Sequence, residues 1–132
     1  MCLDYLSDRA RKVGKLYSIL VVETDGIQRM FRKHAPFDVD EDGWEYATNT
    51  LLSCGRSVDE HYRSGFHMFE SLRDAIDVIM FFSDIRFSHS IIVAFEWDDI
   101  KVQGEKTFKN VSVVGARKPL YIAWDSRHEG GE

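Results

Sequence analysis

The pattern of apolar and polar positions predicts a β-hairpin close to the N-terminal end. Residues Leu16–Glu23 are rich in β-branched and aromatic side chains, and Gly26–Phe31 alternates roughly between apolar and polar types. Asp25-Gly26 lies at their junction. An Asp-Gly pair between strand-like runs indicates a tight turn, because both central turn residues need positive φ. We therefore expect a strand, a turn and a second strand here.

An amphipathic helix is predicted further along the chain. Ser71 is followed three positions later by Asp74, a capping-box pattern in which each side chain satisfies a backbone N–H of the other residue. Arg73, Asp74 and Asp77 fall on the polar side of this helix. One face of a helix of about three turns is therefore expected to be buried. The apolar residues that recur at helical spacing are Leu72, Ala75, Ile76, Ile79 and Met80.

Strand patterns return after the helix and complete the fold prediction. Asp98-Asp99 and Gly104 separate these strands, and Gly104 is expected to turn the chain. A hairpin, one helix and then several strands predict an α+β domain, in which a mainly antiparallel sheet carries one principal helix packed on a face. The strand-like segments after the helix are Ser90–Trp97, Ile100–Val102, Phe108–Ala116 and Pro119–Trp124.

The chain of 132 residues is expected to form a single domain. Its least regular part is the segment 34–64, which we interpret as an irregular acidic insert with a short helix at Trp44–Leu52. Because this segment exceeds an ordinary connection in length, it either packs as a structure of its own or carries the function. Residues 1–14 and 125–132 are expected to be flexible termini.

Net charge and composition narrow the range of partners. Seventeen Lys and Arg against 22 Asp and Glu give a net charge of −5. That balance argues against a general nucleic-acid binder, because such proteins carry a basic surface.

No apolar run is long enough to span a bilayer, and residues 1–12 lack the apolar block of a secretory signal. Cys2 and Cys54 cannot form a disulfide framework. We expect a cytoplasmic protein that contacts neither membrane nor nucleic acid.

The candidate partner-binding surface lies in the acidic insert. Five carboxylates fall within eight residues there and are interleaved with aromatic side chains. Charge steers an encounter and aromatic residues anchor it, so this composition suits a partner protein with a basic surface. The residues expected to bind that partner are Phe37, Asp38, Asp40, Glu41, Asp42, Trp44, Glu45 and Tyr46.

The same segment contains the opening of a calcium loop. Asp38, Asp40, Asp42 and Gly43 spell D-x-D-x-D-G, in which alternate acidic oxygens converge on one cation. The remainder of the loop does not match, because its twelfth position is Asn49 where a bidentate Glu is needed. A calcium-stabilised domain is therefore an alternative, and we expect neither a bound metal nor a cofactor.

Motifs typical of enzymes are absent from the sequence. None of the five histidines has metal-site spacing to another His or Cys, and no phosphate-binding loop or G-x-S-x-G motif occurs. A Cys54–His67 nucleophile–base pair stays open as a hypothesis, because such pairs are neighbours in space rather than in sequence. His67 lies just before the capped helix and is interpreted as a packing residue. We expect a binding protein rather than an enzyme.

The string Gly65-Phe66-His67-x-Phe69 followed by Leu72-x-x-Ala75 resembles a motif of small proteins from phages and other mobile elements. The resemblance extends over residues 16–116, and the Met1-Cys2 start agrees with it. It implies a mobile-element origin, and proteins of this size and source often block a host or defence protein, anti-CRISPR proteins being one group. We expect an inhibitor of a host defence or nucleic-acid-handling protein.

The layout also resembles the core of ADP-ribosyltransferases, in which a glycine–aromatic strand and the following helix flank an NAD pocket. This resemblance implies an alternative pocket at Tyr17, His67 and Glu96. The sequence departs from that family where Tyr17-Ser18 replaces an Arg or His, and where the strand 111–114 lacks the catalytic Glu. An NAD-binding protein, active or inactive, is therefore the alternative function.

Overall fold

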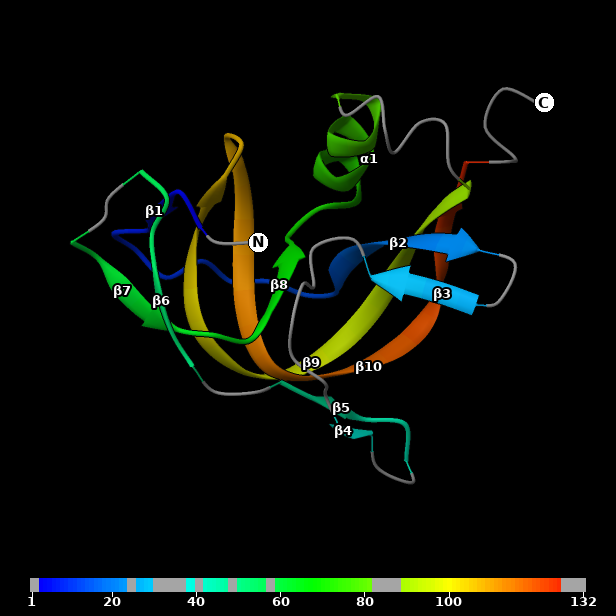
Figure 1. Ribbon diagram of the computed structural model, residues 1–132, viewed down its shortest axis with the longest axis horizontal. Helices are drawn as coiled ribbons and strands as arrows, with labels where there is room; N and C mark the ends of the chain where they lie inside the picture. The colour runs from blue at the N-terminus through cyan, green and yellow to red at the C-terminus, as the bar shows by residue number, and fades with distance from the viewer. Residues whose placement is uncertain are drawn as a thin grey trace.

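The computed structural model describes residues 3–23, 26–29, 38–39, 42–47, 50–56, 59–81 and 89–126. Within these ranges the chain forms ten strands and one helix, and the helix α1 (Leu72–Phe81) lies between β8 and β9 in sequence (Figure 1). The strands are β1 (Tyr5–Leu6), β2 (Leu16–Glu23), β3 (Gly26–Arg29), β4 (Asp38–Val39), β5 (Glu45–Tyr46), β6 (Leu51–Ser53), β7 (His61–Arg63), β8 (Phe66–Phe69), β9 (His89–Lys106) and β10 (Lys109–Asp125).

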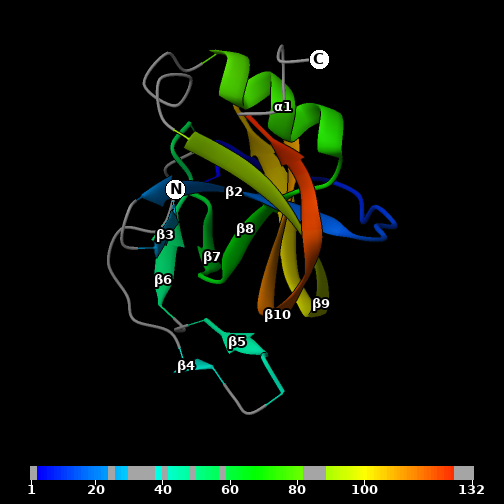
Figure 2. The ribbon, with the colours of Figure 1, turned by 90° about the vertical axis from the view of Figure 1, so that its right-hand side faces the viewer.

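The two long strands β9 and β10 are the framework of the fold. They have 18 and 17 residues and pair with each other from the turn between them as far as Ile91 opposite Asp125. The first half of β9 also pairs with β2, and the first part of β10 pairs with β8. Because β2 and β8 meet where Tyr17 lies opposite Phe69, the pairings β9–β2–β8–β10–β9 close into a ring. Figures 1 and 2 show the strong curl that this closure requires.

The shorter strands extend this sheet at several edges. β3 pairs with β2, β1 pairs with β9, and β5 and then β4 continue from β10. β6 and β7 form a separate two-stranded sheet. All of these pairings are antiparallel. The prediction of a mainly antiparallel sheet with one helix is confirmed for the described residues.

The predicted breaks within the last strands are wrong. Asp98-Asp99 does not end a strand, because β9 runs through it, and Pro119 lies within β10 rather than at the start of a new strand. Asp99 instead has a φ of 60°, and the register between β9 and β10 shifts between Val113 and Val114. Such a bulge adds a residue to one strand and bends it. The long strands therefore curl instead of stopping.

The predicted turn at Gly104 is also wrong. Gly104 lies inside β9 and is buried, and the turn is made by Thr107 and Phe108. A Cβ atom on Gly104 would lie 2.2 Å from the carbonyl oxygen of Tyr5 and 2.8 Å from Leu3 Cδ1. Only glycine fits at this position, because the backbone of β1 lies too close to β9 there for any side chain.

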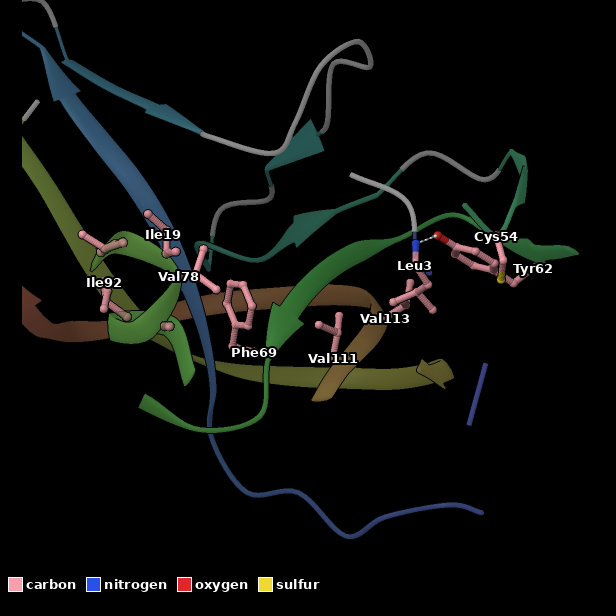
Figure 3. Close-up of a cluster of buried hydrophobic side chains, with 11 residues drawn as sticks. Leu3, Ile19, Cys54, Tyr62, Phe69, Val78, Ile92, Val111 and Val113 are labelled. Atoms are coloured by element: carbon pink, nitrogen blue, oxygen red, sulfur yellow. Dashed lines mark hydrogen bonds between the residues drawn. The ribbon is translucent and has the colours of Figure 1, made fainter. Parts of the chain in front are cut away.

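Each face of the curled sheet carries a hydrophobic cluster. Phe66 of β8 and Phe95 of β9 contact the same side chain, Arg117, and belong to the cluster without residues of α1, which we call the inner cluster. The inner cluster comprises Leu16, Leu20, Phe66, Met68, Ile91, Val93, Phe95 and Val114. The outer cluster, drawn in Figure 3, comprises Leu3, Ile19, Cys54, Tyr62, Phe69, Ala75, Val78, Ile79, Ile92, Val111 and Val113.

Helix α1 packs on the outer cluster and confirms the helix prediction. Its first turn is capped by Ser71, whose Oγ accepts a hydrogen bond of 3.1 Å from the backbone N–H of Asp74. Ala75, Val78 and Ile79 are buried against the sheet. The helix has ten residues, and in the described part of the chain no helix is long and apolar enough to cross a bilayer.

The insert and the N-terminal residues differ from their predictions. The short helix expected at Trp44–Leu52 is wrong, because Glu45–Tyr46 forms β5 and Leu51–Ser53 forms β6, each paired with a strand elsewhere. Residues 3–11 are not a flexible terminus, since Leu3 is fully buried and β1 pairs with β9. Residues 127–132 of the expected C-terminal tail lie outside the described residues.

Candidate functional site

The β4–β5 hairpin carries the described part of the predicted partner-binding surface. Tyr46 lies opposite Ala116 and Glu45 opposite Arg117, so β5 is attached to β10. β4 forms the last strand in the order of the sheet, beyond β5. Figures 1 and 2 both show this hairpin at the end of the molecule opposite α1. The hairpin therefore projects away from the helix-covered side of the sheet.

The exposed side chains of the hairpin are acidic and aromatic. Asp42 is exposed in the turn that precedes β5, and Trp44 is half-buried. Tyr46 is 45% exposed, about as much as Tyr5 and Tyr121 in other strands. Gly43 has a φ of 87°, a conformation that a side chain would strain. Asp42, Trp44 and Tyr46 together form what we call the hairpin surface.

Glu45 is a correction to the predicted surface. Its side chain is buried, with 8% of the residue exposed, because strand alternation points it opposite to its neighbours Trp44 and Tyr46. Its Oε1 accepts a hydrogen bond of 2.9 Å from Nε of Arg117. This carboxylate therefore attaches the hairpin to the sheet and is not displayed to a partner.

Arg117 is the buried cation that receives this carboxylate. The residue is 2% exposed, and its guanidinium carbon lies 4.1 Å from the ring centre of Phe66 and 4.2 Å from that of Phe95. Aromatic faces attract a guanidinium through their quadrupole. A desolvated cation still needs an anionic partner, and Glu45 supplies it. The ion pair and the two rings together hold β5 on the body of the protein.

Several members of the predicted surface lie outside the described residues. These are Phe37, Asp40 and Glu41, while Asp38 is described by its backbone pairing with Tyr46. The calcium hypothesis depends on Asp40, so the structure leaves it as a prediction. Among the described residues, no group of three or more His, Cys, Asp or Glu side chains is placed to hold a metal ion.

His67, a member of the alternative pocket, is held by hydrogen bonds on β8. Its Nε2 lies 2.8 Å from the hydroxyl of Tyr62, and the backbone of Gly65 bonds the ring as well. The Tyr62 hydroxyl also accepts a hydrogen bond of 2.7 Å from the backbone N–H of Leu3. Burial, with a smaller contribution from Lys106, lowers the pKa of His67 to about 3. The ring is therefore neutral near pH 7 and accepts from Tyr62.

The other two members of the alternative pocket, Tyr17 and Glu96, lie on β2 and β9. Tyr17 packs against the outer cluster and lies opposite Ala94 on β9. Glu96 is exposed on β9, opposite Lys118. No hydrogen bond or ion pair within the described part of the chain connects these three residues. An NAD pocket at these positions stays a prediction.

Cys54 belongs to the outer cluster and is 1% exposed. Figure 3 shows it beside Tyr62, whose hydroxyl holds both Leu3 and the ring of His67. The partners of the His67 ring are the Tyr62 hydroxyl and the Gly65 backbone. The Cys54–His67 pair stays a hypothesis. Cys2 lies outside the described residues.

A polar cluster that the sequence did not reveal fixes the N-terminal residues. Arg11 donates to both carboxylate oxygens of Glu70, at 2.8 and 2.7 Å, and the hydrogen bond to Glu70 raises the pKa of Arg11. Glu70 also accepts from Ser112 at 2.8 Å, and Gln103 bonds both Ser112 and the Arg11 backbone. Arg11 and Glu70 are 59 positions apart, so no local signal announces the pair.

Comparison of the chain with protein-family models, with curated proteins and with solved structures found no match.

Proposed function

We propose that this chain acts by binding a protein that has a basic surface, and that the hairpin surface is the contact. The proposal rests on one observation: the hairpin has exposed side chains in its turn and in β5, and a buried ion pair that attaches it to the sheet. Tyr46 is 45% exposed and Asp42 lies in the exposed turn, while Glu45 between them is fixed to the buried Arg117. A rigid base lowers the ordering entropy that the tip loses on binding.

The chemistry of the hairpin surface suits a partner of opposite charge. The carboxylates of the segment steer a basic protein toward the hairpin, and the aromatic side chains supply the apolar area that holds it. The partner class we propose is a host defence or nucleic-acid-handling protein of the cytoplasm, because such proteins carry basic grooves. Occupying that groove would inhibit the partner, which is the mode of action expected for a small phage or mobile-element protein.

The first experiment is a pull-down from nuclease-treated bacterial lysate with the tagged full chain. The test variant reverses Asp40, Glu41 and Asp42 to Lys. The control reverses Asp8, Asp59 and Glu105, which are exposed away from the hairpin, and changes the net charge by the same amount. A stoichiometric partner that is retained by the control, and lost at high salt or with the test variant, supports the proposal.

Two results would overturn the proposal. The first is a partner that both triple variants retain equally, which would place its contact elsewhere on the molecule. The second is the absence of any partner for the wild-type chain across several bacterial hosts. A Tyr46→Ala variant adds a test without a charge change, and it should weaken capture at least tenfold if the ring is an anchor.

A further inference from the structure

The turn between β9 and β10 has a strained backbone. Lys106 lies opposite Lys109, so the loop between them has two residues, Thr107 and Phe108. Their φ values are 53° and 63°. A two-residue hairpin turn with positive φ at both positions favours Asn-Gly, Asp-Gly or Gly-Gly. A β-branched and a bulky residue are both unfavourable in this left-handed conformation.

Packing within the molecule does not offset this strain. Phe108 is 93% exposed, the highest exposure among the large apolar residues described. A phenylalanine gains stability when it leaves water, and this one remains almost fully hydrated. The turn is nevertheless held firmly, because Asp4 accepts a 3.0 Å hydrogen bond from the N–H of Thr107 and pairs with Lys106 at 3.3 Å. A rigid turn therefore presents a single aromatic side chain.

The charges that flank Phe108 compensate one another. Lys106 is paired with Asp4, and Lys109 lies 3.1 Å from Asp77 and 3.8 Å from Asp74 on α1. These pairs place the turn beside the start of α1, as Figure 1 also shows, at the end of the molecule opposite the β4–β5 hairpin. A nucleic acid or an anionic membrane would need unpaired cations around the ring. A balanced polar rim around an apolar residue is instead the arrangement of a protein–protein anchor.

We infer that Phe108 is an anchor residue that inserts into an apolar pocket of a partner protein whose pocket rim is polar and close to neutral. The conformation of Thr107 and Phe108 holds the Phe108 ring in solvent, where it can enter that pocket. This contact is separate from the hairpin surface and does not depend on the proposed function. The two surfaces lie at opposite ends of the molecule, so they can engage two sites at once.

The test begins with the stability of the turn, which needs no partner. Replacing Thr107-Phe108 by Asn-Gly should raise the melting temperature by a few degrees, because the new residues suit the turn. A lower melting temperature would show that Phe108 supports the fold, and it would overturn the inference. The matched control is Leu51→Gly, an exposed apolar residue on β6, which should not raise the melting temperature.

The second part locates the partner by photo-crosslinking. A p-benzoylphenylalanine at position 108 should give one discrete adduct in bacterial lysate, and the same group at position 51 should not. Phe108→Ala should lower capture of that protein at least tenfold, whereas Phe108→Trp should retain it. The Asp40, Glu41 and Asp42 reversal is scored separately, so failure of one surface is distinguished from failure of the other.

Three outcomes of this second part would overturn the inference. One is the absence of a discrete adduct at position 108, and another is the same adduct pattern at positions 108 and 51. The third is sedimentation with vesicles of anionic phospholipid that is lost in Phe108→Ala, since that result would assign the ring to a lipid surface.

Discussion

Arg117 donates a hydrogen bond of 2.9 Å to Glu45, and both residues are buried, with 2% and 8% of their surface exposed. Removing only the anion leaves a buried cation between Phe66 and Phe95. We expect Glu45→Ala to lower the free energy of unfolding by about 3–5 kcal/mol. Urea unfolding at pH 7 measures this loss, and Asp42→Ala, at an exposed position, should change the value by less than about 0.5 kcal/mol.

The double variant Glu45→Leu with Arg117→Met tests the cause of that loss. Replacing a buried ion pair by apolar residues is often neutral or stabilising, so this variant should recover most of the stability lost in Glu45→Ala. If Glu45→Ala costs less than about 1 kcal/mol, the pair does not hold β5 in solution, and the anchoring of the hairpin surface would be wrong.

His67 predicts how stability depends on pH. Its pKa is about 3 in the folded protein and 6.5 for an exposed histidine, so between these values the unfolded chain binds one more proton. The stabilising contribution of the neutral ring is complete above pH 6.5 and is lost as the pH falls toward 3. The slope approaches about 1.4 kcal/mol per pH unit.

Urea unfolding at pH 7.5, 6.0 and 5.0 measures this slope for wild type and for His67→Gln. Other groups titrate in the same range, so the readout is the difference between the two proteins. The variant should lose less stability than wild type on acidification. His61→Gln, at an exposed position on β7, should keep the wild-type slope. Equal slopes for wild type and His67→Gln would contradict the burial of the ring.

Gly65 lies just before β8 and close to the backbone of β10. A Cβ atom there would lie 2.4 Å from the carbonyl oxygen of Val114 and 2.8 Å from Val113 Cγ1, and the first is a backbone atom that cannot rotate away. We expect Gly65→Ala to lower the free energy of unfolding by about 1–3 kcal/mol. Gly14→Ala is the control, because no atom lies within 4 Å of its added Cβ. A stability of Gly65→Ala equal to that of the control would contradict the close approach.

Local patterns predicted the elements whose signals lie within a few residues. Ser71 and Asp74 are three positions apart, and the strand Leu16–Glu23 is continuous in composition, so the helix and β2 were found. The continuity of β9 was missed because Asp98-Asp99 is typical of a loop. Here the left-handed conformation of Asp99 accommodates a bulge, and pairing with β10 continues on both sides of it.

The candidate site was predicted only in part, for a related reason. Asp42 and Tyr46 were identified from composition. A carboxylate within an acidic run is expected to be exposed, so the burial of Glu45 was missed. Its partner Arg117 lies 72 positions away, and pairing of β5 with β10 brings the two together. The turn was likewise expected at Gly104, because glycine is a common turn residue, whereas Thr107-Phe108 has no residue typical of a turn.

Arg11 ties the N-terminal residues to the sheet. Its guanidinium donates to both oxygens of Glu70 and to the carbonyl of Gly104, and the side chains of Arg11 and Glu70 are 26% and 10% exposed. Arg11→Ala leaves a carboxylate at the sheet with Ser112 as its remaining donor among the described contacts. The expected loss of stability is about 1.5–3 kcal/mol. Arg9→Ala, at an exposed neighbouring position, should be close to neutral.

Hydrogen exchange separates a local from a global effect of this substitution. If Arg11 fastens residues 3–11, the amides of Leu3 and Asp4 should exchange faster in Arg11→Ala than the global loss of stability requires. These amides are bonded to Tyr62 and to the carbonyl of Glu105, so they report whether the N-terminal residues stay on the sheet. Unchanged exchange at both amides, together with a loss below about 0.5 kcal/mol, would show that pairing of β1 with β9 fixes these residues without Arg11.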